Sequence, residues 1–353
     1  MNTAPLQDRP DSLKHAGDLL HRRRIPEALH AYNMAEKDGH PRHLCAAGRW
    51  MCWMLTGDFE SAWRESDAIE SSHVIDPNHF WDGSPFDGKR VLLRALHGYG
   101  DAVQFIRYAP MLRRRAAKLI VQTHPELMPL LLTVDGVDQT MTWPDPPLGQ
   151  CCWDQQIEIM ELPRAFRTTP ASVPKRVPYI SIERTLVESS RKRLARTTRP
   201  KIGLLWASSQ YDTSRSMELA VLSPLLRMSE FEFYSFQRGA ERAQLECMSG
   251  RVSDTARHSA AIMDTAADLT NMDLVISVDT FAAHLAAALN RPVWLLLPHA
   301  ADWRWMLVRS DSPWYPSMRL FRQPAPGDWN DVISEVIGEL GRIRSADFWL
   351  RRP

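Results

Sequence analysis

The fold is indicated most clearly by one stretch, Arg90-Val-Leu-Leu-Arg-Ala-Leu-His-Gly-Tyr-Gly-Asp101. An apolar run ends at Leu96, a Gly-x-Gly-Asp turn follows, and an amphipathic segment begins at Ala102. This order predicts a strand, a tight turn and a helix, an arrangement that presents backbone N–H groups and a helix dipole to an anion. Val103 stands where the dinucleotide-binding fingerprint has its third glycine, so we do not predict a dinucleotide site.

A second stretch in the C-terminal half repeats this pattern, Asp273-Leu-Val-Ile-Ser-Val-Asp-Thr280 followed by Phe281-Ala-Ala-His-Leu-Ala-Ala-Ala-Leu289. Here too a predicted strand ends in a turn and a helix begins. We call residues 98–101 the first turn and residues 277–280 the second turn. Two such turns in one chain suggest an enzyme that binds its ligands between two lobes.

Strand-like and helix-like segments alternate around these turns, which favours βαβ units and parallel sheets. Strands are expected at 91–96, 119–122, 157–160, 201–207, 231–236, 274–277 and 293–297, and helices at 102–115, 125–132, 219–227, 259–267, 280–289 and 328–340. The proline-rich stretch 162–178 is interpreted as a crossing between lobes. The predicted fold class is therefore α/β, with two Rossmann-like lobes at 76–180 and 181–353 after a helical module at 1–75.

The N-terminal module carries apolar residues at helical spacing between 11 and 72, with breaks at Arg24-Ile-Pro26 and Thr56-Gly-Asp58. Two helix pairs are expected, with Pro26 in the first turn of a helix. The block resembles the tetratricopeptide repeat (TPR), a helix–turn–helix unit of about 34 residues. Two units leave apolar faces uncovered, so we expect the module to dock on the rest of the chain.

Composition narrows the classes of partner. The 353 residues include 43 basic and 42 acidic side chains, a net charge of +1 that favours neither nucleic acid nor a membrane surface. Basic runs at 22–24, 113–115 and 191–193 are each placed on a predicted helix and interpreted as solvated faces. The five cysteines lack metal-ligand spacing, so neither a zinc site nor a disulfide framework is expected, and a reducing cytoplasm fits best. The first residues lack the basic-then-apolar pattern of a signal peptide, and no apolar run approaches the ~18 residues of a membrane helix, so we expect neither.

The first turn allows two interpretations of Asp101. It follows a predicted strand, at the edge where ligands of open α/β sheets bind, and could serve as a general base. Alternatively, it caps the helix expected from Ala102.

The second turn and the loop after it offer candidates for anion binding. Thr280 is placed at a helix start, where it could donate a hydrogen bond to a diphosphate, and His284 one turn later. A histidine on an apolar helix is more often a satisfied core residue than a ligand. In Asp302-Trp-Arg-Trp305, Arg304 suits phosphate or carboxylate recognition, while the tryptophans could stack on a ligand or fill an interface.

Taken together and in order, several strings resemble the bacterial tetratricopeptide-repeat glycosyltransferases, whose C-terminal part is similar to the ADP-heptose:lipopolysaccharide heptosyltransferase family. The resemblance covers roughly residues 15 to 340. The strings that carry it are Trp81-Asp-Gly-Ser-Pro-Phe-Asp-Gly-Lys-Arg90, Gly98-Tyr-Gly-Asp-Ala-Val-Gln-Phe-Ile-Arg-Tyr-Ala-Pro110, Ile202-Gly-Leu-Leu-Trp-Ala207, Ser277-Val-Asp-Thr-Phe-Ala-Ala-His-Leu-Ala286, the segment 298–305 and Asp311-Ser-Pro-Trp-Tyr-Pro316.

The resemblance implies a glycosyltransferase-B fold, with the nucleotide-sugar donor on the C-terminal lobe and the acceptor on the N-terminal lobe, and neither metal nor cofactor. It implies an inverting hexosyl or heptosyl transfer in which the TPR-like helices recruit an acceptor protein, flagellin in some relatives, or a glycan. The implied residues are Asp101 as catalytic base, Gly98, Gly100 and Gln104 at the acceptor turn, and Asp279, Thr280, His284, Arg215, Ser208 and Arg304 on the donor.

Two departures from that pattern keep other functions open. Relatives commonly read Glu-Gln-Gly-Leu-Gly-Asp at the first turn, where this chain has Leu96, and Ala-Gly-Asn where it has Ala207-Ser-Ser209. A TPR-bearing interaction protein that keeps the fold without catalysis is the first alternative. An enzyme of nucleotide-sugar metabolism, such as an epimerase that releases its nucleotide, is the second. The nucleotide, sugar, acceptor and oligomeric state stay open.

Overall fold

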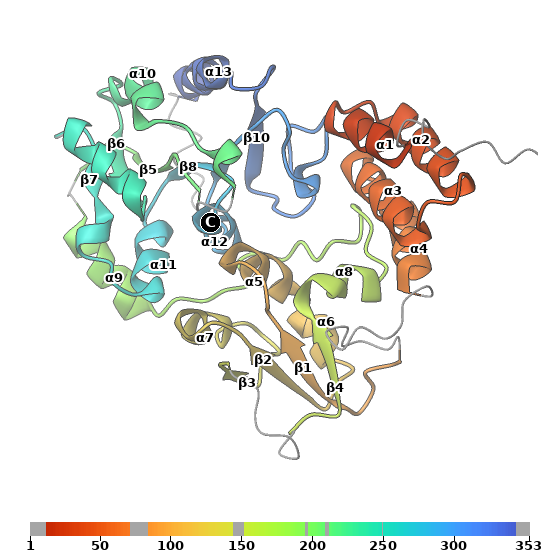
Figure 1. Cartoon of the computed structure of the whole chain (residues 1–353). Coiled ribbons are helices and arrows are strands. Elements are labelled where there is room, and N and C mark those ends of the chain that lie inside the picture. The colour runs from red at the N-terminus through yellow and green to blue at the C-terminus, as the bar shows by residue number, and fades with distance from the viewer. Residues whose placement is uncertain are drawn as a thin grey trace, which may run out of the picture. The chain divides into compact units, whose positions relative to one another are not determined.

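The computed structural model describes residues 12–70, 84–143, 152–194, 197–208, 212–248 and 250–343 (Figure 1). The start of the resemblance string at 81–83 and the departure at Ser209 lie outside the described residues. The chain divides into two compact units. The helical unit comprises the described part of Met1–Asn78 with Arg164–Val173 and Ala300–Arg309, and the α/β unit comprises the rest.

The helical unit confirms the expected helices. They are α1 (Ser12–His21), α2 (Ile25–Lys37), α3 (Arg42–Thr56) and α4 (Phe59–Glu70). Pro26 lies in the first turn of α2, and Gly57 ends α3 in the left-handed conformation with φ of 84°. Helices α2 and α3 approach closely because Gly48 has no side chain, since a Cβ there would lie 2.1 Å from the Tyr32 ring. The likeness to a TPR stays a prediction.

Two later segments complete the helical unit. The Trp63 indole donates a hydrogen bond to the Thr168 carbonyl at 2.6 Å. Arg23 donates to the Ala301 carbonyl at 2.8 Å, and the Trp303 ring meets Trp50 edge to face at 5.5 Å. The expectation that the module docks on later parts of the chain is confirmed, and the docking segments are Arg164–Val173 and Ala300–Arg309.

The first sheet of the α/β unit is parallel, in the order β3-β2-β1-β4. Its strands are β1 (Arg90–Arg94), β2 (Lys118–Gln122), β3 (Gln139–Met141) and β4 (Gln155–Glu158), with helices α5 (Tyr99–Phe105), α6 (Ala109–Arg113), α7 (Met128–Leu131) and α8 (Leu162–Ala165). The single helix expected at 102–115 is wrong. The helical segment begins at Tyr99 and is divided into α5 and α6 by a 3₁₀ turn at Ile106–Tyr108. The division arises because Pro110 lacks the N–H that a continuous helix needs.

The second sheet is also parallel, in the order β10-β9-β8-β5-β6-β7. Its strands are β5 (Lys201–Leu205), β6 (Glu232–Ser235), β7 (Ser253–Asp254), β8 (Leu274–Val278), β9 (Val293–Leu297) and β10 (Met318–Arg322), with helices α9 (Arg184–Arg193), α10 (Ser223–Leu226), α11 (Ile262–Thr270), α12 (Phe281–Ala288) and α13 (Trp329–Arg342). Strands β3, β7 and β10 were not predicted. Of the basic runs, 191–193 ends α9, whereas 22–24 forms the turn after α1 and 114–115 follows α6, so the expected helical placement is wrong there.

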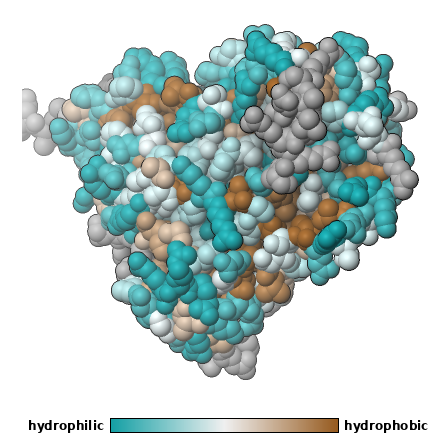
Figure 2. Space-filling view, turned by 180° about the vertical axis from the view of Figure 1, so that it is seen from behind, coloured by the Kyte–Doolittle hydropathy of each residue, from teal (hydrophilic) through white to brown (hydrophobic). Residues whose placement is uncertain are grey.

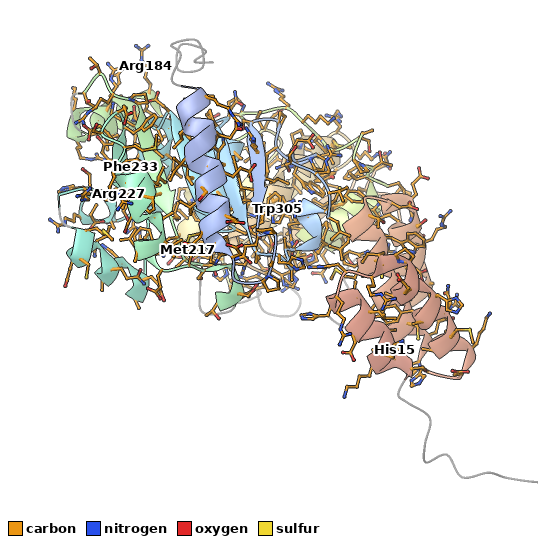
Figure 3. All side chains as sticks on the ribbon, turned by 90° about the horizontal axis from the view of Figure 1, so that it is seen from above. His15, Arg184, Met217, Arg227, Phe233 and Trp305 are labelled. Carbon is orange, nitrogen blue, oxygen red and sulfur yellow. The ribbon has the colours of Figure 1, made fainter. Side chains whose placement is uncertain are left out.

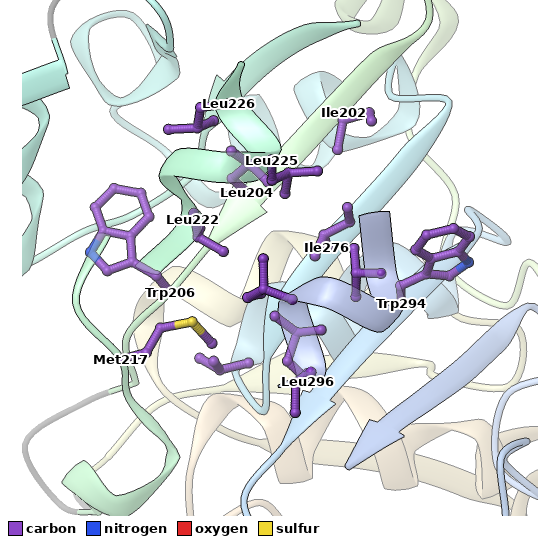
Figure 4. Packing of buried hydrophobic residues seen from close by; sticks show 14 of the residues in the cluster. Ile202, Leu204, Trp206, Met217, Leu222, Leu225, Leu226, Ile276, Trp294 and Leu296 are labelled. Carbon is purple, nitrogen blue, oxygen red and sulfur yellow. The ribbon is translucent and has the colours of Figure 1, made fainter. Parts of the chain in front are cut away.

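Alternate residues of the second sheet build its core. Ile202 and Leu204 of β5 point to the same face as Ile276 of β8 and Leu296 of β9, where α10 and α13 cover them (Figure 4). Figure 3 shows α13 running alongside the strands of this sheet, consistent with its contacts to β10. Asp328 caps α13 as expected, accepting the Asp331 N–H at 3.2 Å.

Large apolar side chains are mostly enclosed. The face drawn in Figure 2 is largely hydrophilic, with apolar residues in limited patches. Among the described residues, the exposed large apolar side chains are Met34, Leu44, Leu132 and Val308. In the described part of the chain, no helix is long and apolar enough to cross a membrane.

The strand orders identify where a ligand would bind. In the first sheet β1 lies between β2 and β4, and in the second sheet β5 lies between β6 and β8. The chain therefore reverses direction across each sheet at β1/β4 and at β5/β8. In open α/β sheets, ligands bind beyond the carboxyl ends of the strands at such a switch point.

Candidate functional site

The first turn places a carboxylate at the carboxyl end of β1. Asp101 is the third residue of α5, and its Oδ2 accepts the Gly98 N–H at 3.1 Å. The capping interpretation is right only in part: the helix begins at Tyr99 and its N-cap is Gly98, and Asp101 accepts the N–H of that N-cap residue from inside the helix. The side chain is still partly exposed. Capping and reaction with a ligand are therefore compatible, and the role as a base stays a prediction.

At the second turn two predicted donor residues lie around the buried carboxylate of a third. Asp279 is 4% exposed, and its Oδ1 lies 3.4 Å from His284 Nε2 while its Oδ2 lies 3.7 Å from the Arg215 guanidinium. Arg215 also pairs with Asp212 at 3.1 Å. Asp279 thus holds a residue of α12 and a residue of the loop after β5, so it organises this end of the second sheet.

Thr280 caps the start of α12 and His284 lies one turn into it, as the sequence predicts. The Thr280 hydroxyl accepts the Ala283 N–H at 3.4 Å and lies 3.0 Å from the Ser277 hydroxyl. His284 is buried, with Nδ1 2.9 Å from the Tyr315 hydroxyl in addition to Nε2 near Asp279. The interpretation of His284 as a satisfied buried histidine is confirmed, and its role toward a donor stays a prediction.

The two turns pack against each other through α5 and α12. A Cβ on Gly100 would lie 3.1 Å from His284 Cδ2, so the glycine allows the imidazole to lie directly against the α5 backbone. The rings of Tyr99 and Phe281 also meet edge to face at 5.7 Å. The carboxyl end of the first sheet therefore adjoins the carboxyl end of the second.

Sequence reasoning missed a buried arginine beneath this contact. The Arg107 guanidinium lies 4.3 Å from the Tyr315 ring centroid and 5.0 Å from that of Tyr179. It donates to the Tyr179 hydroxyl at 3.0 Å and to the Trp314 carbonyl. Burial raises the pKa of both tyrosines, so they stay neutral around the cation. Arg107 belongs to the quoted string 98–110, which was the available signal.

The loop after β5 is fixed by hydrogen bonds. Gln237 Oε1 accepts the N–H groups of Trp206 and Ala207 at 3.2 and 3.0 Å. The Ser208 hydroxyl donates to the Asp212 carbonyl at 2.7 Å, and its N–H donates to the Ser216 hydroxyl at 3.0 Å. Ser208 therefore helps to shape the segment that carries Arg215.

Gln104 and Arg304 complete the predicted site residues. Gln104 is fully buried within α5, although it was expected to line the acceptor turn. Arg304 belongs to the helical unit, where it lies 4.6 Å from the Trp303 ring and pairs with Asp302 at 2.9 Å. The role of Arg304 toward a donor stays a prediction.

A second acid beside the first turn was also missed. Glu158 ends β4, next to β1, and is 9% exposed. Its Oε2 accepts the Met160 N–H at 2.6 Å and so caps a 3₁₀ turn at 159–161. The strand expected at 157–160 therefore ends early, at Glu158. Glu158 could have been found by the rule applied to Asp101, since it too stands at a strand's carboxyl end. Among the described residues, no three His, Cys, Asp or Glu side chains gather as a metal site.

Comparisons with known proteins agree with this architecture. No family model matches the chain. It is 24% identical over 290 residues to the protein FlbA of Caulobacter vibrioides, a match covering 74% of this chain and 48% of FlbA. The chain thus spans about half the length of that curated relative.

Solved structures share the fold. A glycosyl transferase family 9 protein from Veillonella parvula matches with a TM-score of 0.51 and 10% identity, over 74% of this chain and 91% of its own. The ADP-heptose lipopolysaccharide heptosyltransferase II of E. coli matches with a TM-score of 0.51 and 13% identity, over 72% of this chain and 98% of its own. The parallel sheets and their turns thus have the glycosyltransferase-B fold.

Proposed function

We propose that this chain is a glycosyltransferase that moves a sugar from a nucleotide-sugar donor to an acceptor hydroxyl. One observation carries the proposal. A partly exposed carboxylate, Asp101, ends the first sheet at its switch point, on a helix that packs against the anion-binding type of helix start at the second switch point. The fold shared with sugar-transferring enzymes supports the same conclusion.

In the proposed reaction Asp101 acts as general base. Its carboxylate takes the proton of the acceptor hydroxyl while that oxygen bonds to the anomeric carbon. The bond from the anomeric carbon to the donor diphosphate breaks, and the diphosphate leaves with the electron pair. Attack from the face opposite the leaving group inverts the anomeric configuration, and no metal takes part in the step as we propose it.

The leaving diphosphate would be stabilised at the second turn. The start of α12 at Thr280 supplies backbone N–H groups and the positive end of a helix dipole. Arg215 supplies a cation held nearby by Asp279 and Asp212. The helical unit, if TPR-like, would recruit a protein or glycan acceptor, and we place the reaction in the cytoplasm.

A panel of nucleotide sugars tests the proposal. The purified chain is screened by thermal shift with UDP-, ADP-, GDP-, CMP- and dTDP-sugars, because a ligand at a hundred times its Kd adds about 2.7 kcal/mol of stability. Any stabilising donor is then incubated with candidate protein and glycan acceptors. Mass spectrometry that finds a sugar joined to an acceptor supports the proposal. A donor that binds and yields free sugar, or no product, contradicts it.

A non-catalytic interaction protein of the same fold is the second candidate. It is favoured by the internal pairing of Asp279 and His284, whose polar groups already bind Arg215 and Tyr315. It predicts that no nucleotide sugar raises the melting temperature.

A further inference from the structure

Tyr315, in the loop before β10, lies between two polar groups of the α/β unit. Its hydroxyl is 2.9 Å from His284 Nδ1, and its ring centroid is 4.3 Å from the Arg107 guanidinium. Tyr315 is fully buried, and the other two residues are at most 5% exposed. A buried polar hydrogen without an acceptor is costly, so the hydrogen bonds of this group have a defined direction.

The carboxylate of Asp279 locates the hydrogen on the imidazole. His284 Nε2 lies 3.4 Å from Asp279 Oδ1, and a carboxylate oxygen can only accept. Arg215 reaches Asp279 twice, with its guanidinium 3.7 Å from Oδ2 and a hydrogen bond of 3.4 Å to the Asp279 carbonyl. Nε2 therefore carries the hydrogen of a neutral imidazole, and Nδ1 is left as an acceptor.

Arg107 favours Tyr315 as the donor to that nitrogen. The guanidinium donates to neutral oxygens, which are the Gln104 carbonyl at 2.6 Å, the Trp314 carbonyl and the Tyr179 hydroxyl at 3.0 Å. These partners do not cancel its positive charge, which attracts the electrons of the phenol ring that it faces. The charge thus strengthens the Tyr315 O–H as a donor and disfavours a second positive charge on the imidazole.

Tyr315 keeps its hydrogen around neutral pH. Burial raises the pKa of this phenol well above the usual range, with Tyr179 adding to the shift and Arg107 opposing it. The Tyr179 hydroxyl is already engaged, since it donates to the Val103 carbonyl at 3.0 Å and accepts from Arg107. The hydrogen of Tyr315 is therefore left for His284 Nδ1.

We propose that Tyr315 is a positioning residue for the second turn. Its hydroxyl donates to His284 Nδ1 and holds the imidazole as the tautomer with hydrogen on Nε2. That hydrogen is directed at Asp279 Oδ1, so the carboxylate keeps Oδ2 toward Arg215. The orientation of the arginine is thereby fixed through the imidazole. This inference rests on the proposed function where it assigns Arg215 to the leaving diphosphate.

The tautomer is tested without turnover by ¹⁵N NMR of the full chain with labelled histidines. The His284 signals are identified through contact with the Tyr315 ring, whose centroid is 5.7 Å away, and by their loss in His284→Gln. We expect hydrogen on Nε2 alone in the wild type, and a changed Nδ1 shift in Tyr315→Phe, which lacks only the hydroxyl. Tyr234→Phe, at a buried tyrosine of β6, is the matched control and should leave both shifts unchanged.

Two results would overturn the proposal. Hydrogen on Nδ1 in the wild type would mean that the imidazole donates to Tyr315, and this spectrum decides the matter even where a variant does not fold. Identical His284 shifts in the wild type and Tyr315→Phe would mean that the hydroxyl does not hold the ring.

The consequence for Arg215 is tested with inorganic pyrophosphate, which carries the diphosphate group without a nucleotide or a sugar. Calorimetry should show binding to Tyr315→Phe weakened by about 2- to 100-fold, the range for coupled neighbours, and unchanged binding to Tyr234→Phe. In an Arg215→Ala background, Tyr315→Phe should have no further effect. Equal losses in both backgrounds would overturn positioning through Arg215. If pyrophosphate does not bind the wild type, the anion site of the proposed function fails, while the NMR spectra still decide the tautomer.

Discussion

The first and second turns both join a strand to a helix, but the aspartate of the first is partly exposed and that of the second is buried. Asp101 accepts the N–H at the start of its own helix and stays partly exposed. Asp279 is 4% exposed and lies between His284 and Arg215. One strand-to-helix turn thus presents its acid outward, and the other uses its acid to tie three elements together.

This difference in exposure suggests a chemical role for Asp101 and a structural role for Asp279. A carboxylate that stays in reach of solvent can take a proton from a bound hydroxyl. A buried carboxylate that holds an arginine and an imidazole is costly to disturb, because both side chains lose a partner when it is removed. We therefore expect changes at Asp101 to lower turnover and changes at Asp279 to lower stability.

The largest expected effect is on turnover at the first turn. Asp101→Asn keeps the size of the side chain and removes the base, so the transfer rate should fall by about 10²- to 10⁴-fold. Donor affinity, measured by calorimetry, should stay unchanged. Asp135→Asn, at an exposed turn residue of the same unit, is the matched control and should keep full activity. Unchanged turnover in Asp101→Asn would exclude the role as base.

The next largest effect is a dependence of stability on pH, which arises from Glu158 beside the first turn. The pKa of Glu158 is about 8 in the folded protein against an ordinary 4.5, so the folded state holds the proton more tightly. Stability contributed by this group is present below pH 4.5 and is lost as the pH rises to about 8. The loss is at most about 5 kcal/mol.

Urea unfolding at pH 5 and pH 8.5 measures this loss. Glu158→Gln carries no titrating group at this position, so it should lose less stability than the wild type between the two pH values. Glu188→Gln, on the exposed side of α9, is the control and should behave as the wild type does. Parallel pH curves for all three proteins would show that Glu158 ionises normally.

At the second turn we expect an effect on folding. Asp279→Asn leaves Arg215 and His284 without their shared carboxylate and should cost about 2 to 4 kcal/mol, somewhat below the range for a fully buried pair. Asp212→Asn removes the other partner of Arg215, but Asp212 is 41% exposed, so its cost should stay below about 1 kcal/mol. Denaturant unfolding compares the two. Equal losses would mean that burial does not distinguish the two aspartates.

From the sequence, the two turns could be predicted well, whereas three strands of the sheets around them were missed. The apolar run before Gly98 and the one before Asp279 are local signals, so both strand–turn–helix units were predicted close to where they form. The three strands that were missed, β3, β7 and β10, are short or lie at sheet edges, where few side chains are buried on both faces.

The candidate site was predicted in part for the same reason. The pairing of β5 with β8 brings together Asp279, His284 and Arg215. The periodicity of apolar residues along the sequence does not show which strands are neighbours. The place of Glu158 at a strand's carboxyl end could be predicted, but its place beside β1 could not, because that contact joins residues far apart in the chain. Arg304 was assigned to the donor because its guanidinium suits phosphate, and that role stays a prediction, since its loop belongs to the helical unit.

The smallest predicted effect tests whether the two turns depend on each other. Gly100→Ala adds a Cβ that would lie 3.1 Å from the His284 ring. That ring is held at both nitrogens, by Tyr315 and Asp279, so it has little room to move, and we expect a loss of about 1 kcal/mol. Gly338→Ala, in the middle of α13 with open space around it, should instead gain about 0.5 to 1 kcal/mol from helix propensity. Thermal unfolding should show a lower melting temperature for Gly100→Ala and a higher one for Gly338→Ala. A gain in both would show that the first turn can move away from His284 at no cost, and that the contact between the turns is loose enough for each to act alone.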